Sequence, residues 1–271
     1  MLFNAATSIL ALPEKELKAI PASEWVEFGI LLHKAKPTIA TLFNLSNAIM
    51  VEAERSGGVR DISSVVANMM ERERLSVTLI ARTAGNVIDA KWVVTSSYSS
   101  TVSRALEEIA SRRPLRVTVA ESLPGGEGGQ FAERLSEKGI SVELVPDTNV
   151  FARMSNADCA ITGADSVTPD GLVNKIGTRA LVEAARCCGR PAYAVCSLSK
   201  ASPVVLSDMI VSQRMLTERL SERTQIFEST PLELLSSVIT ESGVYAPDDL
   251  LVQLRGLKMA AAWSSIGVER S

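Results

Sequence analysis

Residues 163 to 178, GADSVTPDGLVNKIGT, hold the side chains with the clearest capacity for chemistry. Asp165 follows an apolar run, and the small Gly163 and Ala164 before it leave room beside its carboxyl group. A carboxyl group in such a setting could act as a general acid or base. The alternative is structural, because an aspartate at this place is also typical of a cap of a helix or turn.

Cationic and amide side chains are expected close to Asp165. Asn174 and Lys175 are predicted to open a helix and to face the same edge of the fold as Asp165. Lys200 ends the sequence SLSK after the next apolar run and adds a second cation. Because ammonium groups bind anionic groups in charge-assisted hydrogen bonds, we expect an anionic ligand here.

A run of hydroxyl side chains follows the apolar segment KWVVT at residues 91–95. A helix is predicted to start near Thr101, which places free backbone N–H groups and the positive end of the helix dipole beside these hydroxyls. That arrangement favours an anion, and the alternative is a simple helix cap. The residues predicted to line an anion site are Ser97, Ser99, Ser100 and Thr101.

The residue types present disfavour several other chemistries. The chain has one histidine, His33, so it cannot build a multi-histidine metal site, and a Ser-His-Asp triad would have to use that residue. The segment ESLPGGEGGQ, residues 121–130, matches no nucleotide-binding glycine motif and is interpreted as a flexible surface turn. We therefore predict neither a metal ion nor a cofactor.

Charge and cysteine usage indicate where the protein acts. Lys+Arg of 28 against Asp+Glu of 31 gives a net charge of -3, which disfavours direct nucleic-acid binding through phosphates. The start of the chain shows no signal peptide and no apolar run is long enough to span a membrane, so we predict a cytoplasmic protein without a membrane partner. Reduced, buried thiols are predicted for Cys159, Cys187, Cys188 and Cys196.

The pattern of the sequence changes near residue 90. Residues 13–89 read as helical, with breaks at Pro21, Pro37 and Gly57-Gly58. Short runs rich in valine and isoleucine follow, spaced as parallel strands would be, at 91–95, 115–122, 141–147, 159–167 and 191–197. Two domains are predicted, residues 1–89 and residues 90–271.

Helical segments between the runs complete the pattern. Thr101 to Arg112 places Val102, Ala105, Leu106, Ile109 and Ala110 on one face. A second helix is predicted to carry the apolar stripe Ile176, Ala180, Leu181, Ala184, Cys187 and Cys188. Alternating strands and helices predict an α/β fold of the doubly wound kind, whose ligands bind at the carboxyl ends of the strands. The tail from residue 227 is predicted to be a turn and a helix.

Three segments carry a resemblance to a known family. GADSVTPDGLVNKIGT, PAYAVCSLSK and FESTPLELLSSVITESGV resemble the translation initiation factor 2B alpha, beta and delta subunits. The same superfamily includes methylthioribose-1-phosphate isomerase and ribose-1,5-bisphosphate isomerase, and the likeness runs from about residue 33 to nearly the end. The resemblance implies an N-terminal helical domain followed by a Rossmann-like parallel sheet with flanking helices.

The resemblance also implies roles for individual residues. The isomerases convert an aldose phosphate to a ketose phosphate with a cysteine and the aspartate that matches Asp165, while Asn174 and Lys175 match substrate contacts. Ser97 stands at the cysteine position, and a hydroxyl is a far weaker acid than a thiol. Leu123 stands where many relatives have an arginine before the proline, which removes a phosphate contact.

Both departures point away from efficient isomerisation, and Ser97 favours binding over catalysis. The leading hypothesis is an initiation factor 2B-like regulatory subunit that binds a sugar phosphate or a nucleotide monophosphate. The alternative is an aldose-ketose isomerase, an intramolecular oxidoreductase, that works through Asp165. A third possibility is a purely structural subunit, which would need the pocket to be blocked.

Assembly is predicted from the end of the chain. Residues 248–268 carry more apolar side chains than a solvated terminus needs. Family relatives associate through their Rossmann-like domains, so we expect a homodimer or a higher homo-oligomer, with an initiation factor as a possible further partner. The alternative is that this segment packs on its own sheet.

Overall fold

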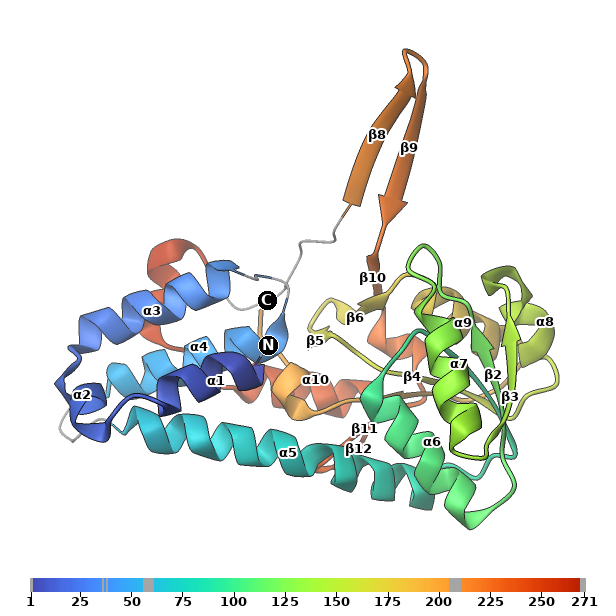
Figure 1. Ribbon diagram of the computed structural model, residues 1–271, viewed down its shortest axis with the longest axis horizontal. Coiled ribbons are helices and arrows are strands. Elements are labelled where there is room, and N and C mark those ends of the chain that lie inside the picture. The colour runs from blue at the N-terminus through green and yellow to red at the C-terminus, as the bar shows by residue number, and fades with distance from the viewer. Residues whose placement is uncertain (1, 36, 38, 56–60, 205–210, 269–271) are drawn as a thin grey trace.

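The computed structural model describes residues 2–35, 37, 39–55, 61–204 and 211–268. A group of helices from the N-terminal third lies beside a sheet covered by helices, and one hairpin projects from the body (Figure 1). This is the α/β fold expected from the sequence, with a helical N-terminal region ahead of a mostly parallel sheet. In the part of the chain described, no helix is both long and apolar enough to cross a membrane.

The N-terminal helices begin earlier than the pattern indicated, because residues before 13 are also helical. Asp61 starts the longest helix, where its side chain accepts a hydrogen bond from the Ser64 backbone N–H at 3.0 Å. Trp25, Leu45, Ile49 and Val66 are buried together and hold the helices to one another. Their bounds are α1 Leu2–Leu10, α2 Glu14–Ala19, α3 Ala22–Ala35, α4 Ala40–Ala53 and α5 Ile62–Val87. The predicted break at Gly57-Gly58 lies outside the described residues.

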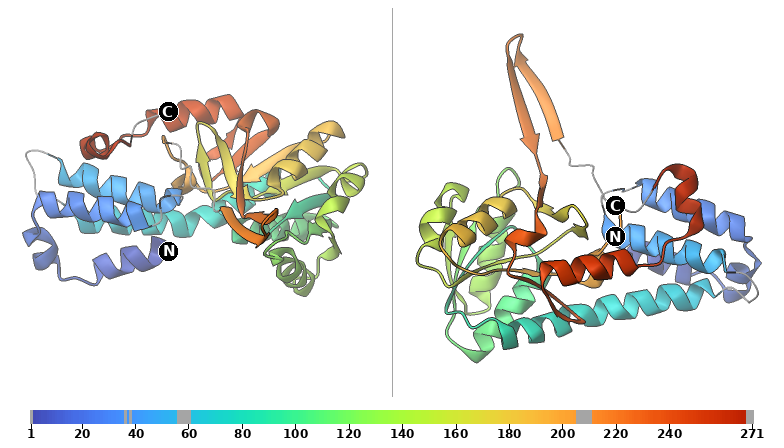
Figure 2. Two further views of the ribbon diagram at one scale, coloured as in Figure 1. Left: turned by 90° about the horizontal axis from the view of Figure 1, so that it is seen from above. Right: turned by 180° about the vertical axis from the view of Figure 1, so that it is seen from behind.

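Helix α5 joins the two parts of the molecule. It runs under the other helices at one end and reaches the sheet at the other, where it lies beside α6 (Ser100–Arg112), as Figures 1 and 2 show. Ile80 and Ala84 of α5 are fully buried in the same cluster as Leu106 of α6. The helix therefore fixes the position of the sheet relative to the N-terminal helices.

The central sheet has seven strands in the order β12-β11-β7-β4-β1-β2-β3. Six of them run parallel, and only β12 pairs antiparallel, with β11. The order reverses direction at β1, which lies between β4 and β2. The bounds are β1 Trp92–Ser96, β2 Arg116–Ala120, β3 Ser141–Val145, β4 Cys159–Thr162, β7 Ala192–Val195, β11 Ser237–Thr240 and β12 Gly243–Tyr245.

Helices cover both faces of the sheet, as the apolar strands require. One face packs against α5, α6 and α7 (Glu127–Glu137), with Leu106 and Phe131 fully buried there. The other face packs against α8 (Val150–Met154), α9 (Thr178–Cys187) and α10 (Pro247–Gly256), with Met154 and Leu181 fully buried. The buried face predicted for residues 101–112 is confirmed at Val102, Ala105, Leu106 and Ile109.

A second sheet, which the sequence did not predict, lies at the edge where the parallel strands end. It has the order β10-β6-β5, with β5 at Ser166–Thr168, β6 at Gly171–Lys175 and β10 at Phe227–Thr230. Residues 159–167 are therefore not one strand. The prediction that Asn174 and Lys175 open a helix is wrong, because both end β6 and the helix begins only after Gly177, whose φ of 96° turns the chain.

Two further expectations are corrected by the C-terminal third. The tail from residue 227 is not a turn and a helix, because β10, β11 and β12 precede α10. Val238 and Ile239 are fully buried on opposite faces of β11, which pairs with β7 and β12, so this apolar pair belongs to a strand inside the sheet and not to a helix. The stripe predicted on α9 is also wrong in part, because Ala180 and Cys187 are exposed. The buried positions of α9 are Thr178, Leu181, Val182, Ala184 and Ala185.

The C-terminal segment is divided between two partners: α10 packs on the sheet through Leu250 and Leu254, and the residues after it pack on the N-terminal helices. Trp263, in the short 3-10 helix η4 (Ala261–Ile266), is fully buried against Phe43 and Met50 of α4. Glu54 accepts hydrogen bonds from the backbone N–H groups of Ala261 and Ala262 at 2.7 and 2.8 Å and caps η4. The apolar residues that suggested an interface between chains thus find much of their cover within this chain.

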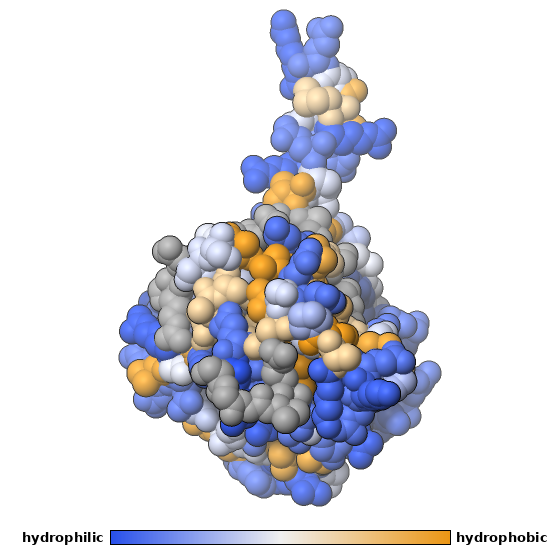
Figure 3. All heavy atoms as spheres, turned by 90° about the vertical axis from the view of Figure 1, so that its left-hand side faces the viewer, coloured by the Kyte–Doolittle hydropathy of each residue, from blue (hydrophilic) through white to orange (hydrophobic). Residues whose placement is uncertain are grey.

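The projecting element is a hairpin of β8 (Val211–Thr217) and β9 (Leu220–Gln225), which pair antiparallel. It stands away from the body as a narrow ribbon, with apolar residues among hydrophilic ones (Figure 3). Residues 211–223, which make up most of the hairpin, are all exposed. Its second strand leads directly into β10 and so into the small sheet.

Candidate ligand-binding site

A pocket of about 360 Å³ opens at the carboxyl ends of β1 and β4. This is the point where the strand order reverses, and ligands of doubly wound sheets bind there. Side chains of the described residues do not fill the pocket. Of the residues predicted from the sequence, those that line it are Ser97, Ser99, Ser100, Asp165, Asn174, Lys175 and Lys200.

The remaining predicted residue, Thr101, is buried in the first turn of α6 and does not line the pocket. Ser99 caps this helix, since its Oγ accepts a hydrogen bond from the Val102 N–H at 3.3 Å, and it lines the pocket as well. Ser99 is therefore both the N-cap of α6 and part of the pocket wall. Ser100, the first residue of α6, also lines the pocket, at the end of the helix where backbone N–H groups lack partners within the helix.

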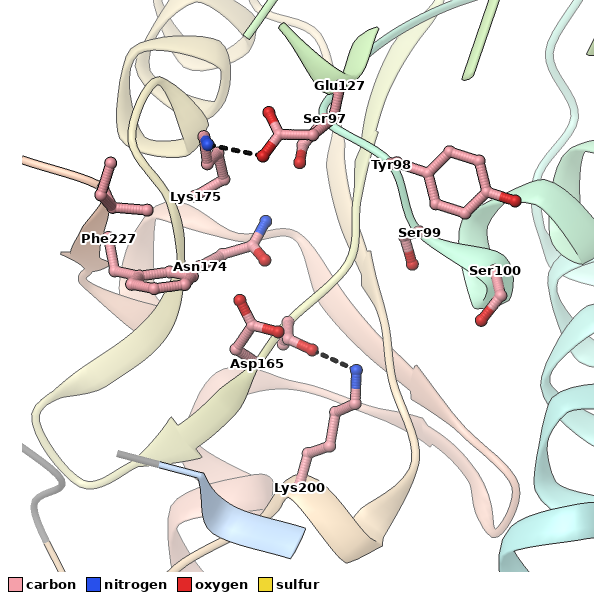
Figure 4. A pocket seen from close by; sticks show the side chains of 12 residues that line it. Ser97, Tyr98, Ser99, Ser100, Glu127, Asp165, Asn174, Lys175, Lys200 and Phe227 are labelled. Carbon is pink, nitrogen blue, oxygen red and sulfur yellow. Dashed lines mark hydrogen bonds and ion pairs between the residues drawn. The ribbon is translucent and has the colours of Figure 1, made fainter. Parts of the chain in front are cut away.

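The GAD segment approaches this turn closely. A Cβ atom at Gly163 would lie 2.8 Å from Ser99 Oγ, closer than real side chains allow. Glycine is needed there for β4 to end beside the hydroxyl turn. The Tyr98 ring turns away from the pocket residues and packs edge-on against Phe131, 5.5 Å away, which anchors the turn to α7 (Figure 4).

Ser97 is held in the left-handed region, with φ of 61°. Its N–H donates to Ser122 Oγ at 2.6 Å, and Ser122 has a φ of 63° itself. The Asp147 carboxylate accepts from the N–H groups of Ser122 and Leu123 at 2.7 and 2.8 Å. Since left-handed serines are strained, this chain of hydrogen bonds fixes the turn that carries Ser97.

Asp165 lies between β4 and β5, where its N–H donates to the Val173 carbonyl at 2.9 Å. Its side chain faces the open pocket beside Asn174 and Lys200 (Figure 4). Desolvation by the pocket walls raises the pKa of the Asp165 carboxyl, and the positive charges of Lys200 and Lys175 oppose this rise. The carboxyl therefore keeps its proton to a higher pH than an ordinary aspartate and could act as an acid.

Asn174 and the two lysines are held by defined partners. The Asn174 amide donates to Thr162 Oγ1 at 3.2 Å and to Thr178 Oγ1 at 3.0 Å, which fixes its side chain between β4 and α9. Lys200, in the 3-10 turn η2 (Leu198–Lys200), donates its Nζ to the Ala164 carbonyl. Lys175 is only 7% exposed, and its Nζ lies 2.7 Å from Glu127 Oε1.

Five residues of the pocket wall were not among those predicted; Tyr98 and Ala164 adjoin predicted residues, and Glu127, Ile226 and Phe227 come from other segments. Glu127 is the first residue of α7, inside the glycine-rich segment that was interpreted as a flexible turn. An acid between two glycine pairs at a strand end was the signal that could have found it. Ile226 and Phe227 reach the pocket from the base of the hairpin, and no local signal indicates this.

The pocket carries balanced charge. Lys175, Lys200, Asp165 and Glu127 all line it, so its formal side-chain charges cancel when all four are ionised. Within the residues that the structure describes, no three His, Cys, Asp or Glu side chains are grouped to hold a metal ion.

A helical N-terminal region, a mostly parallel sheet and a polar pocket at its switch point define a Rossmann-like α/β protein with a candidate ligand site. The sequence profile of the Initiation factor 2 subunit family matches residues 15–247, and the chain belongs to this family. The expected family resemblance is thereby confirmed.

Individual relatives agree with this membership. The chain is 28% identical over 248 residues to a protein of Pyrococcus horikoshii named translation initiation factor eIF-2B subunit 2-like, covering 90% of this chain and 89% of that protein. It is 27% identical over 236 residues to a ribose 1,5-bisphosphate isomerase of Archaeoglobus fulgidus, covering 80% and 74%. The crystal structure of the Pyrococcus horikoshii OT3 translation initiation factor eIF-2B matches with a TM-score of 0.73 and 28% identity, covering 90% and 88%.

Proposed function

We propose that this protein is an initiation factor 2B-like regulatory subunit that binds a sugar phosphate or a nucleotide monophosphate in the cytoplasm. One observation carries the proposal. The buried ammonium group of Lys175 and the hydroxyl turn at the α6 N-terminus line the same pocket, at the switch point of the sheet.

The pocket suits a small phosphorylated molecule. A phosphate group would lie between residues 97–100 and Lys175, with Lys200 as a second cation. The other polar groups of the ligand would contact Asp165 and Asn174. The Phe227 ring would form an apolar wall for a sugar or a base (Figure 4). The volume of about 360 Å³ lies within the range of sites for ligands of this size.

Calorimetric titration with ribose 5-phosphate, AMP and inorganic phosphate tests the proposal. Lys175→Ala is expected to weaken binding about tenfold or more, the loss expected when a charge-assisted contact worth ~1.5 kcal/mol or more is removed. Lys138→Ala is the matched control, because Lys138 is an exposed lysine at the end of α7. Equal affinities of the wild type and Lys175→Ala would show that the phosphate does not bind here.

The alternative function, aldose-ketose isomerisation, is favoured by one feature. Asp165, with its raised pKa, lines the same pocket as Ser97. Isomerisation moves a proton between neighbouring carbons and needs a base as well as an acid. A serine hydroxyl has no neutral-pH base form comparable with a thiolate, so we expect little or no turnover.

An assay with methylthioribose-1-phosphate and ribose-1,5-bisphosphate decides between the two functions. Robust turnover that disappears in Asp165→Asn would establish the isomerase. In that case Ser97→Cys should raise the rate further.

We also propose that the protein acts as a homodimer or a higher homo-oligomer and that an initiation factor is a further partner. Membership of the family supports this. The hairpin of β8 and β9 supports it as well, because it exposes Val211, Met215, Leu216 and Leu220, and an unsupported two-stranded ribbon is marginally stable in water.

A further inference from the structure

The cation best placed to bind a phosphate already has an anionic partner. Lys175 Nζ lies 2.7 Å from Glu127 Oε1, and the lysine is 7% exposed while the glutamate is 39% exposed. The two side chains meet at the top of the pocket, from β6 and from the start of α7 (Figure 4). The lysine is thus fixed by the body of the protein, and the glutamate faces solvent.

A glycine makes this contact possible. A Cβ atom at residue 125 would lie 2.4 and 2.5 Å from the Glu127 carboxylate oxygens, so the carboxylate folds into space that any other residue would fill. Gly125 is not among the glycines with positive φ, and its backbone therefore tolerates alanine. The side chain at position 125 decides whether the carboxylate can lie where it does.

The carboxylate is incompletely satisfied in this position. Glu127 Oε2 is buried and accepts no hydrogen bond from any described residue. A buried carboxylate oxygen without a donor is unfavourable, so attraction to Lys175 holds the side chain there against a desolvation cost. A group that satisfies Lys175 better would release Glu127 to solvent.

We infer that Glu127 is an internal counter-ion that occupies the phosphate position at Lys175, and that the ligand binds by displacing it. The inference rests on the proposed function. A phosphate monoester carries a charge of about -1.5 to -2 at neutral pH, so it both attracts Lys175 more strongly than a carboxylate does and repels Glu127. The residue thereby lowers the affinity for every anion, and only an anion that attracts Lys175 strongly displaces it.

The test is calorimetric titration of the full chain with ribose 5-phosphate, inorganic phosphate and acetate. Glu127→Gln keeps the shape and removes the charge, and Gly125→Ala keeps the charge and displaces the carboxylate. Each is expected to bind both phosphates about tenfold more tightly, a change of ~1.4 kcal/mol. Acetate binding should gain as well, because the cost of displacing Glu127 is common to every anion that binds at Lys175.

Two further variants separate the possible outcomes. Glu133→Gln, an exposed glutamate on the same helix, should leave the affinities unchanged. Adding Lys175→Ala to Glu127→Gln should abolish the gain. If Glu127→Gln and Gly125→Ala leave phosphate affinity unchanged or weaken it while Lys175→Ala still loses binding, the counter-ion role is wrong and the proposed function stands. If Lys175→Ala binds as the wild type does, or no variant binds either phosphate, the proposed function fails and the inference falls with it.

Discussion

Trp263 stacks on Phe43, with the ring centroids 4.8 Å apart and the planes at 29°. The indole Nε1–H donates to Asn47 Oδ1 at 2.9 Å, and the same amide oxygen accepts the Ala260 N–H. A residue near the C-terminus is therefore part of the core of the N-terminal helices. The chain passes from the N-terminal helices to the sheet along α5, and its C-terminal segment comes back to those helices at Trp263. This contact connects the N-terminal helices to the end of the sheet domain.

Loss of this contact should destabilise the protein strongly. Trp263→Ala removes a fully buried ring and leaves a cavity between α3 and α4, so the free energy of unfolding should fall by about 3–5 kcal/mol. Trp263→Phe keeps most of the ring and loses one hydrogen bond, and should cost clearly less. Urea unfolding measures both, and a loss below about 1 kcal/mol for the alanine variant would contradict the assignment.

His33 should make stability depend on pH. It packs edge-on against Phe43 and Trp263, its Nδ1 has no partner among the described residues, and burial lowers the pKa of the imidazole below its ordinary 6.5. The unfolded chain then binds the proton first, so the contribution of neutral His33 is full above pH 6.5 and is lost as the pH falls through 6.5 towards the folded pKa.

The comparison variant for this effect is His33→Gln. The chain has a single histidine, so the difference between wild type and variant isolates this group. Urea unfolding from pH 8 to pH 5 should show a constant difference above about pH 7 and a shrinking advantage of the wild type below about pH 6.5. A difference that does not change with pH would mean that His33 titrates normally in the folded protein.

Periodic patterns predicted the large elements because they record burial directly. The face of residues 101–112 and most positions of β1, β2 and β7 are buried as their spacing indicates, within one or two residues at the ends, whereas the run at 159–167 breaks after Thr162. Asn174 and Lys175 show the limit of such patterns. Their position on β6 depends on pairing with β5 and β10, and β10 is far away in sequence.

The pocket shows the same division between local and distant information. Ser97, Asp165 and Lys200 follow strands of one parallel sheet, and strand ends meet at one edge whatever the details of the fold. The position of Phe227 at the pocket depends on where the chain re-enters the small sheet after the hairpin. The pairing of Glu127 with Lys175 depends on the space left by Gly125. Neither relationship has a signature in local composition.

Asp147 should act on the ligand without touching it. Its carboxylate accepts two backbone N–H groups, from Ser122 and Leu123, and Ser122 in turn holds the N–H of Ser97. In Asp147→Asn the amide group cannot accept both, so the turn loosens. We expect a stability loss of about 1–3 kcal/mol and a severalfold weaker binding of ribose 5-phosphate.

A matched control exists at the opposite edge of the sheet. Asp158 accepts the N–H groups of Lys91 and Trp92 at 2.8 and 2.9 Å, at the start of β1. Both N–H groups bind the same oxygen, Oδ2, so Asp158→Ala is the variant that removes them; it should cost at least comparable stability by urea unfolding and leave ligand affinity unchanged in calorimetry. Equal effects of the two variants on affinity would reduce Asp147 to a purely structural role.

The hairpin should carry the contact between chains. Val211, Met215 and Leu220 are exposed on β8 and β9, whereas Leu250, Leu254 and Trp263 of the C-terminal segment are buried within the chain. Light scattering at micromolar concentration should therefore give a mass at least twice the 29.0 kDa of one chain. The double variant Met215→Ser and Leu220→Ser should shift the protein to that single-chain mass, because it removes two exposed apolar side chains without altering the body.

Val252→Ser with Leu257→Ser is the matched control, since both residues are exposed in the C-terminal segment that the sequence singled out. An assembly that survives the hairpin variant and dissociates in the control would return the interface to the C-terminal segment, and a wild type at 29.0 kDa would refute the oligomer.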